Sequence, residues 1–258
     1  MSELSSYDVE LDPSWSIGDK PHGGYLLREL VAPALDAAHP HPLAVSAHYV
    51  ASPQARDARI EVERLRIGRR VASSRLRLAQ DGAVKVEGLL SAGTLGGDAE
   101  PFFSSGAPPR LPPRADCPRE AADRQDGPRV GQLDHVELRL DPATRAWAQD
   151  LPAGDGEVRG WLRRADGADA DARDLLVFAD ALPPVTFGLG LPGWVPTVEL
   201  TVLVRSLPAP GWLRGVQRTR LLRDGWLDEE CEVWDSRDRL VVQARQLAGY
   251  RVPGGRSA

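Results

Sequence analysis

The chain contains an internal repeat that covers most of its 258 residues. Each half has a helix-like segment, then an apolar strand that ends in a Pro-containing turn, then three further strand-like runs. Pro53 and Pro208 close equivalent strands (208 − 53 = 155), and Ala92 and Ala248 lie at the ends of the last strands (248 − 92 = 156). A nearly constant offset with the same element order predicts two copies of one small fold. The alternative is chance similarity between two amphipathic β-meanders.

The strand-like runs have the alternation of half-buried antiparallel strands. Ile60 and Val62 flank the charged Glu61, and similar alternation continues through the run 71–82. Asp81-Gly82 between two such runs is a strong signal for a tight hairpin turn. The sequence therefore predicts a meander of antiparallel strands in each half.

One helix is predicted over about residues 25–37, where apolar residues cover one side. Pro33 lies inside this segment and must kink the helix or end its regular part. One helix wrapped by an antiparallel meander, repeated twice, is the layout of a double hotdog fold in the α+β class. We expect an N-terminal hotdog over residues 1–95 and a C-terminal hotdog, carrying the candidate site, over 132–258. The Pro-, Arg- and Asp-rich segment 96–131 between them is predicted to be an extended, poorly packed linker.

Composition excludes several classes of protein. The formal charge of −5 and the sequence pI of about 5.6 argue against a nucleic-acid partner, which favours a basic surface. No run of 18 apolar residues is present, so no membrane span is predicted, and the polar start of the chain does not resemble a signal peptide. Cytoplasmic localisation is the expectation. Cys117 and Cys231 are too few for a disulfide framework or a structural zinc site, and we expect two reduced thiols rather than one disulfide.

The common catalytic motifs are absent from the sequence: it has no GxSxG, HExxH, Walker or GxGxxG pattern. His39 and His41 lie in a predicted turn, AHPHP, and His48 alternates with apolar neighbours as a strand residue does. No clustered ligands point to a metal site, and no cofactor is expected.

Paired glycines precede the first helix in PHGGYLL. Gly23, Gly24 and Tyr25 would place unpaired backbone N–H groups at the positive end of the helix dipole, where they suit the oxyanion formed from a thioester carbonyl. The structural alternative is that the two glycines only allow a tight turn into the helix.

The repeat also singles out polar residues that only the second half carries. Glu199 matches Ala44, and Gln246 matches Leu90, while Thr219 lies between them in the sequence. A carboxylate, a hydroxyl and a carboxamide on three strands could hold and activate a water molecule. Alternatively, Glu199 is an outward strand residue and Thr219 an ordinary strand residue.

Four segments resemble one known family: HGGYL at 22–26, FADALPP at 178–184, WVPTVELTV at 194–202 and WDSRDRLVVQARQLA at 234–248. Over roughly residues 15–251, outside the linker, the chain resembles the acyl-CoA thioesterase II family, the TesB-like double hotdogs, and in particular its actinobacterial branch.

The resemblance implies an active site in the second hotdog, where an Asp, a Ser or Thr and a Gln orient a water against the thioester. The motif matches put the hydroxyl at Thr219 and the carboxamide at Gln246, and the carboxylate falls at Glu199, where the family has Asp. That extra methylene matters, because a misplacement of about 1 Å can cost ~100-fold in rate. Asp180 in FADALPP matches a family acid and has either a structural pairing role or a direct catalytic part.

We therefore expect hydrolysis of acyl-CoA or an acyl-carrier thioester without a covalent intermediate, with the acyl chain along Leu26 and Leu30. One alternative is an enoyl-thioester hydratase or dehydratase, which would need a histidine such as His22 or His48 in the channel. Another is an acyl-CoA-binding protein with a degenerate site. Homo-oligomers are common in the family, and no nucleic-acid or membrane partner is expected.

Overall fold

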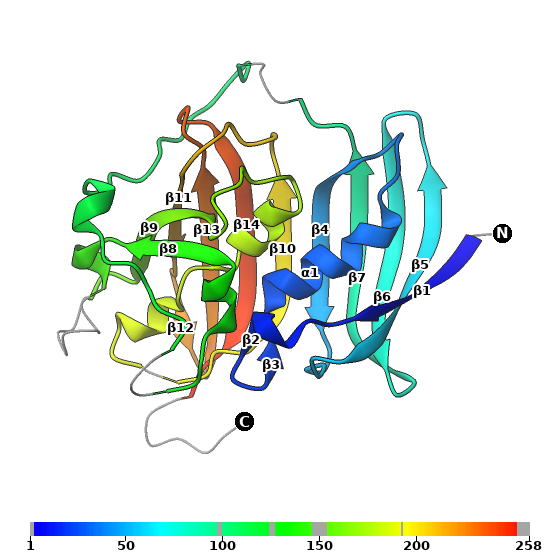
Figure 1. The fold of residues 1–258 in the computed structure, drawn as a ribbon, viewed down its shortest axis with the longest axis horizontal. Coiled ribbons are helices and arrows are strands. Elements are labelled where there is room, and N and C mark those ends of the chain that lie inside the picture. The colour runs from blue at the N-terminus through cyan, green and yellow to red at the C-terminus, as the bar shows by residue number, and fades with distance from the viewer. Residues whose placement is uncertain (1–2, 97–99, 124–126, 146–153, 192, 252–258) are drawn as a thin grey trace.

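Twelve antiparallel strands form the main sheet of the protein (Figure 1). The computed structural model describes residues 3–96, 100–123, 127–145, 154–191 and 193–251. The strands of the first half are β1 (Glu3–Glu10), β4 (His41–Tyr49), β5 (Asp57–Ile67), β6 (Val71–Gln80) and β7 (Ala83–Gly93). Those of the second half are β8 (Val136–Leu140), β9 (Glu157–Arg164), β10 (Thr197–Val204), β11 (Leu213–Arg218), β12 (Leu222–Arg223), β13 (Trp226–Trp234) and β14 (Leu240–Gly249). A separate two-stranded sheet pairs β2 (Ser16–Ile17) with β3 (Lys20–Pro21).

The order of the strands in the main sheet is β1-β5-β6-β7-β4-β10-β14-β13-β11-β9-β8, and β12 extends β13. The two halves meet at β4 and β10, which are antiparallel neighbours in the middle of the sheet. Val45 pairs with Leu90 in the first half where Leu200 pairs with Gln246 in the second, so the pairing register follows the sequence repeat. The predicted double hotdog is confirmed.

Two helices lie on the inner face of the sheet and pack against each other. α1 (Gly23–Val31) crosses the first half (Figure 1), and α2 (Asp174–Phe178) is its shorter counterpart in the second half. The regular part of α1 ends at Val31, and Pro33 lies in the 3-10 turn that follows, as its fixed φ predicts. That turn is η2 (Ala32–Ala34), and the other 3-10 helices within the described residues are η1 (Pro13–Trp15), η3 (Arg114–Asp116), η4 (Gly131–Asp134), η5 (Pro142–Thr144) and η7 (Val185–Phe187).

The predicted hairpin at Asp81-Gly82 is present. Both residues have positive φ, 53° and 74°, as a type I′ turn requires. Asp224 and Gly225, between β12 and β13, make a turn of the same kind in the second half, with φ of 54° and 84°. Strands β1, β8 and β9 were not predicted from the sequence. β1 and β8 are edge strands, so each has a neighbour on one side only.

The connecting segment is extended, but the expectation of poor packing is wrong for its second part. The thiol of Cys117 is fully buried, the Trp161 indole donates to the Pro112 carbonyl (3.1 Å), and the Glu120 N–H donates to the Leu138 carbonyl (2.9 Å). The edge strand β8 leaves backbone groups unpaired on one side, and the connector satisfies part of them. Cys117 and Cys231 are both free thiols, as predicted.

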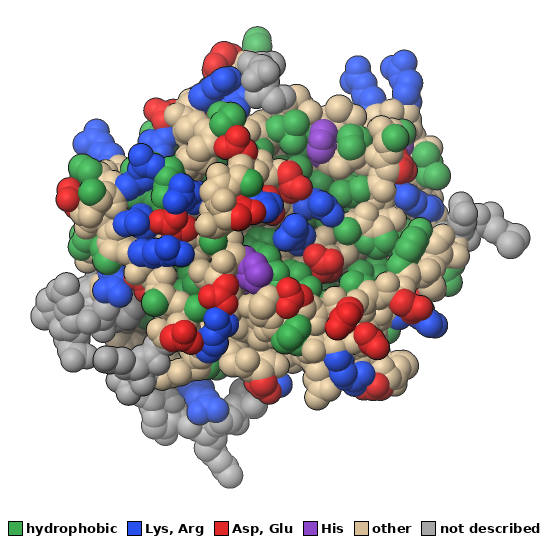
Figure 2. Space-filling model, viewed as in Figure 1, with side chains coloured by type: hydrophobic (Ala, Val, Ile, Leu, Met, Phe, Trp, Pro, Cys, Tyr) green, Lys and Arg blue, Asp and Glu red, His purple; other side chains and the backbone are tan. Residues whose placement is uncertain are grey.

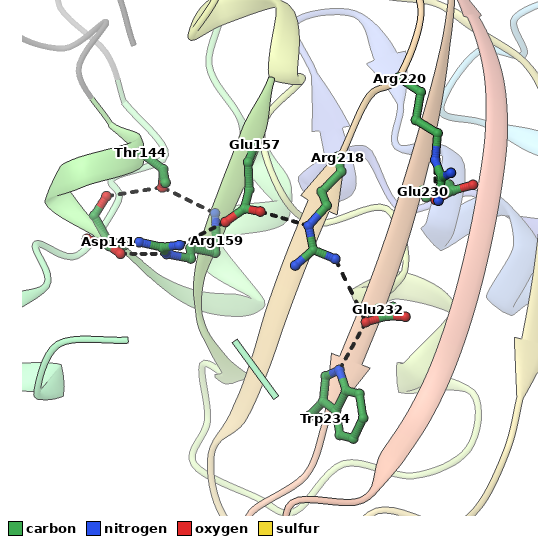
Figure 3. Close-up of polar contacts among 9 residues, drawn as sticks. All are labelled: Asp141, Thr144, Glu157, Arg159, Arg218, Arg220, Glu230, Glu232 and Trp234. Atoms are coloured by element: carbon green, nitrogen blue, oxygen red, sulfur yellow. Dashed lines mark hydrogen bonds and ion pairs between the residues drawn. The ribbon is translucent and has the colours of Figure 1, made fainter. Parts of the chain in front are cut away.

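The outer face of the sheet is charged and the inner face is apolar. Figure 3 shows that Glu157 on β9 accepts from Arg159 (2.9 Å) and from Arg218 on β11 (2.7 Å). The Arg218 guanidinium also lies close to the Glu232 carboxylate on β13. Figure 2 is viewed from the side on which α1 lies in Figure 1, and positive and negative side chains are interspersed over that face of the molecule as well. No helix in the described part of the chain is long and apolar enough to cross a membrane.

Candidate active site

A cavity of about 1040 Å³ opens between the start of α1, the end of α2 and the inner face of the second half of the sheet. Its apolar lining includes Leu26 from α1, Leu138 from β8 and Phe187 from η7. Its polar lining comes from both halves and includes His22, Tyr49, Asp180, Thr197, Gln217, Glu229 and Gln246. A largely apolar cavity with a few polar side chains in its wall is typical of a substrate site.

Asp180 is a carboxylate that lines the cavity. It follows α2, and its Oδ2 accepts from the Gly24 N–H at the start of α1 (2.8 Å). The same oxygen lies 3.4 Å from His22 Nε2, and only 13% of the side chain is exposed. Burial raises the pKa of Asp180, against the opposing effects of His22 and the Gly24 N–H. The carboxylate is therefore fixed in direction and shifted toward greater basicity.

His22 joins the two halves beside Asp180. Its Nδ1 accepts from the Tyr25 N–H (3.2 Å), which caps α1, and its Nε2 lies 2.9 Å from the Asp180 carbonyl oxygen. Because Nδ1 accepts the Tyr25 N–H, the ring proton directed at the Asp180 carbonyl is on Nε2. Both ring nitrogens are thus used to hold the chain.

The two glycines are required by close packing. A Cβ on Gly23 would lie 2.7 Å from Asp180 Oδ2, and a Cβ on Gly24 would lie 2.8 Å from the Leu176 carbonyl oxygen of α2. The Tyr49 hydroxyl donates to the Gly23 carbonyl (2.9 Å), and burial raises the pKa of Tyr49 well above its usual value. The start of α1 therefore packs closely against Asp180, the Leu176 carbonyl of α2 and the Tyr49 hydroxyl.

A second polar cluster lies on the inner face of β10, β11, β13 and β14. Thr197 Oγ1 donates to Gln246 Oε1 (2.7 Å), and Gln246 Nε2 donates to Glu229 Oε2. Glu229 Oε1 accepts from the Val185 N–H (2.8 Å), and Gln217 also hydrogen-bonds to this carboxyl. Glu229 is 2% exposed, and its burial raises its pKa to about 7.

The three residues predicted to hold a water do not come together. Gln246 lines the cavity, whereas Glu199 lies on the opposite face of the sheet, where it accepts from Ser46 (3.0 Å) and Thr201 (2.6 Å). Thr219 follows the end of β11, its N–H donates to the Gly156 carbonyl (3.0 Å), and its buried hydroxyl has no partner within the described residues.

The physical reason for the position of Glu199 is the period of two along a strand. Glu199 pairs with Leu247, one position beyond Gln246, so the two side chains point to opposite faces. A register shift between Thr197 and Glu199 lets Thr197 point inward instead. His48 pairs with Glu199 and is exposed, so it does not enter the cavity.

The predicted oxyanion residues surround the start of α1, but two of their N–H groups already have acceptors in the protein. The Gly24 N–H donates to Asp180, and the Tyr25 N–H donates to His22. Gly23 is the first residue of α1 and lines the cavity.

Sequence reasoning missed Thr197, Gln217 and Glu229. The repeat contained a signal for two of them: the register makes Ser74 the counterpart of Glu229 and Val62 the counterpart of Gln217. Extending the comparison that selected Gln246 along the neighbouring strands would have found both.

Both halves of the chain match models of known protein families. Residues 11–93 match the family model of the acyl-CoA thioesterase N-terminal domain, and residues 113–250 match that of the C-terminal domain. The chain belongs to the acyl-CoA thioesterase family. The family predicted from the four sequence segments is confirmed.

Individual relatives agree with this assignment. An uncharacterised protein of Mycobacterium tuberculosis is 30% identical over 267 residues, which cover 94% of this chain and 90% of that protein. The crystal structure of a candidate thioesterase II from Thermobifida fusca is 34% identical, with a TM-score of 0.85 and coverage of 96% of this chain and 92% of that one. A hot dog fold protein of unknown function from Alicyclobacillus acidocaldarius has a TM-score of 0.81 at 22% identity, with coverage of 97% and 96%, and so supports the fold alone.

Proposed function

We propose that the protein hydrolyses acyl-CoA thioesters by direct attack of water, with Asp180 as the general base. The observation that carries this proposal is a single cavity, in an acyl-CoA thioesterase family member, that Asp180, Thr197 and Gln246 all line. A thioester of an acyl-carrier protein has the same reacting group as an acyl-CoA, and the assay below distinguishes these two substrates.

Asp180 takes the proton of the attacking water as the oxygen adds to the thioester carbonyl. Its Oδ2 is held by the Gly24 N–H, so the carboxylate does not need to reorient during the reaction. A raised pKa brings the base closer to the working pH, which improves proton transfer. When the carbon–sulfur bond breaks, the proton passes to the departing thiolate, and the products are the free acid and the thiol.

In the same proposal, Thr197 and Gln246 also hydrogen-bond to the water that Asp180 activates. Because the Thr197 hydroxyl donates to Gln246 Oε1, its oxygen lone pairs can accept from a water. The Gln246 amide has a second Nε2 hydrogen beyond the one directed to Glu229, and this hydrogen can reach a water or the substrate. The carboxylate role thus moves in this proposal from Glu199 to Asp180, and the hydroxyl role moves from Thr219 to Thr197.

Gly23 keeps its predicted role toward the oxyanion. Its N–H lies at the positive end of α1, whereas the Gly24 and Tyr25 N–H groups are used within the protein. Leu26 lines the cavity and would contact the acyl chain, while Leu30 is fully buried in the core.

The test is thiol release from a panel of acyl-CoAs and matched acyl-carrier thioesters by wild type, Asp180→Asn and Glu199→Gln. We expect turnover by wild type, loss in Asp180→Asn, and retention in Glu199→Gln. Equal turnover by wild type and Asp180→Asn would remove Asp180 from the mechanism. Binding of acyl-CoA by calorimetry without thiol release would support the degenerate-site alternative instead.

A hydratase acting on an enoyl thioester is the second candidate, because His22 and Asp180 lie 3.4 Å apart, one from each half. Such chemistry needs a ring nitrogen that can exchange a proton with substrate, and both nitrogens of His22 are bonded within the protein. Loss of the enoyl absorbance from an enoyl-CoA without release of free thiol would favour the hydratase over the thioesterase.

A further inference from the structure

We propose that Glu229 is a positioning residue whose charge decides which end of the Gln246 carboxamide faces Thr197. This inference rests on the proposed function for its effect on rate, and it concerns a residue outside the three that would contact the water. Glu229 lies on β13, between Gln246 on β14 and Gln217 on β11. Its side chain is on the inner, buried face of the strand.

Every oxygen of Glu229 is engaged by a donor. Oε1 accepts from the Val185 N–H (2.8 Å), whose position is set by the backbone of η7. Oε2 accepts from Gln246 Nε2, and Gln217 adds a further side-chain hydrogen bond. With the carboxylate ionised, Gln246 must therefore turn its NH₂ toward Glu229 and its Oε1 toward Thr197. The observed bond from Thr197 Oγ1 to Gln246 Oε1 (2.7 Å) agrees with this orientation.

Protonation reverses this requirement. Val185 offers only a donor to Oε1, and in our proposal the added proton is on Oε2, which faces Gln246. An O–H group there needs an acceptor, and Gln246 can supply one only by rotating its amide so that Oε1 points at Glu229. The NH₂ group would then face Thr197, and the hydroxyl of Thr197 would accept instead of donating. The water-holding face of the site therefore exists in two arrangements, selected by one buried proton.

The surroundings place this proton in the neutral pH range. Burial is the main cause that raises the pKa of Glu229 to about 7, and the negative charge of Asp180 at the end of α2 adds to it. Cys231 shares the inner face of β13, and burial raises the pKa of its thiol. His22 faces Asp180 from the start of α1, while Gln217 and Gln246 on the two flanking strands carry no charge.

The experiment follows the Gln246 side-chain NH₂ signals by ¹H–¹⁵N NMR from about pH 5 to about pH 9 in the full chain. The signals are assigned by their loss in Gln246→Leu. We expect them to shift with one midpoint near that of Glu229, and to become independent of pH in Glu229→Gln, whose amide keeps an acceptor for Val185 and presents NH₂ to Gln246. Glu230→Gln is the matched control, since Glu230 is the next residue on β13, faces outward and pairs with Arg220.

Rates give the second readout. In wild type kcat/KM should rise about 10-fold as Glu229 ionises, and this limb should be missing in Glu229→Gln and present in Glu230→Gln. Gln246 signals that do not titrate in wild type, or the same pH–rate profile in wild type and Glu229→Gln, would overturn the proposal. If wild type titrates at Gln246 but releases no thiol from any thioester, the proposed function fails and the two-state Gln246 stands.

Discussion

The two halves of the sheet share a central strand order, β4-β7-β6-β5 in the first and β10-β14-β13-β11 in the second, and three equivalent inward positions differ in polarity. Val62, Ser74 and Leu90 on the inner face of the first half correspond to Gln217, Glu229 and Gln246 in the second. In the first half, apolar side chains there complete the core, and Ser74 is buried at 1% exposure.

In the second half these positions form part of the cavity wall. Buried polar groups are costly unless they are hydrogen-bonded, and here they bond to one another. The difference teaches that one scaffold can serve as support in one copy and as a site in the other, through a few inward-facing residues.

The first half is nevertheless part of the site. It supplies the Gly24 N–H, which donates to Asp180, and the Tyr49 hydroxyl, which donates to the neighbouring Gly23 carbonyl. In the proposed mechanism the site is therefore composite: one half positions the base, and the other half positions the groups around the water.

The largest expected effect comes from the base. Asp180→Asn keeps the size of the side chain and removes its ability to take a proton, so kcat should fall by about 10² to 10⁴-fold in a thiol-release assay. Glu199→Gln, on the outer face of the same half, should change kcat less than about 3-fold. Comparable losses in the two variants would show that the inner and outer faces are not functionally distinct.

The second largest loss of activity is expected when Gln246 is replaced by the leucine that the first half has at the equivalent position. Gln246→Leu copies Leu90, removes the partner of both Thr197 and Glu229, and should lower kcat/KM by about 100-fold. Gln243→Leu on the exposed face of β14 is the matched control and should be close to wild type. A fully active Gln246→Leu would mean that the polar residues of the second half are not what separates the halves.

Contact between the two halves can be tested at Gly24. A Cβ there would lie 2.8 Å from the Leu176 carbonyl, so Gly24→Ala should lower the free energy of unfolding by about 1–3 kcal/mol in chemical denaturation. Gly96→Ala has open space around the added methyl and should change stability by less than about 0.5 kcal/mol. Equal stabilities would show that α1 and α2 can separate without cost.

The smallest expected effect is a pH-dependent stability. The pKa of Glu229 is raised from 4.5 to about 7 in the folded state, so the folded protein binds more protons between these values. Stability from this group is therefore present below pH 4.5 and is lost as pH rises through about 7. Glu229→Gln should match wild type near pH 5 and exceed its free energy of unfolding by about 1–2 kcal/mol near pH 8. Glu230→Gln should show no such gain, and a Glu229→Gln variant less stable at both pH values would contradict the assigned shift.

The main elements of each half were predictable because they depend on local chemistry. Alternation of apolar and charged residues predicted β5 and β6. Asp81-Gly82 predicted the turn between β6 and β7, and Pro33 predicted the end of the regular part of α1. Edge strands such as β1 escaped prediction because a strand with one neighbour and exposed faces has a weak apolar pattern.

The site was only partly predictable. Gln246 was found because a polar residue replaced Leu90 at the repeat offset. Glu199 and Thr197 lie two positions apart in the sequence, and only the register shift between them decides that Thr197 faces the cavity and Glu199 the outer face. Thr219 and Gln217 are likewise two apart, but β11 ends at Arg218, so Thr219 leaves the sheet before it can line the cavity.

The sequence by itself determined the double hotdog and the half in which polar residues replace apolar ones, because hydrophobic period and repeat offset can be read along the chain. The family followed from the resemblance of four short segments to acyl-CoA thioesterases. Only the tertiary structure decided which side chains share the cavity. It brought Asp180 against Gly24, 156 positions away, and it placed Glu229 between two glutamines. The physical reason is that strand ends, bulges and helix–helix contacts set side-chain direction, and each of them depends on partners that are distant in sequence.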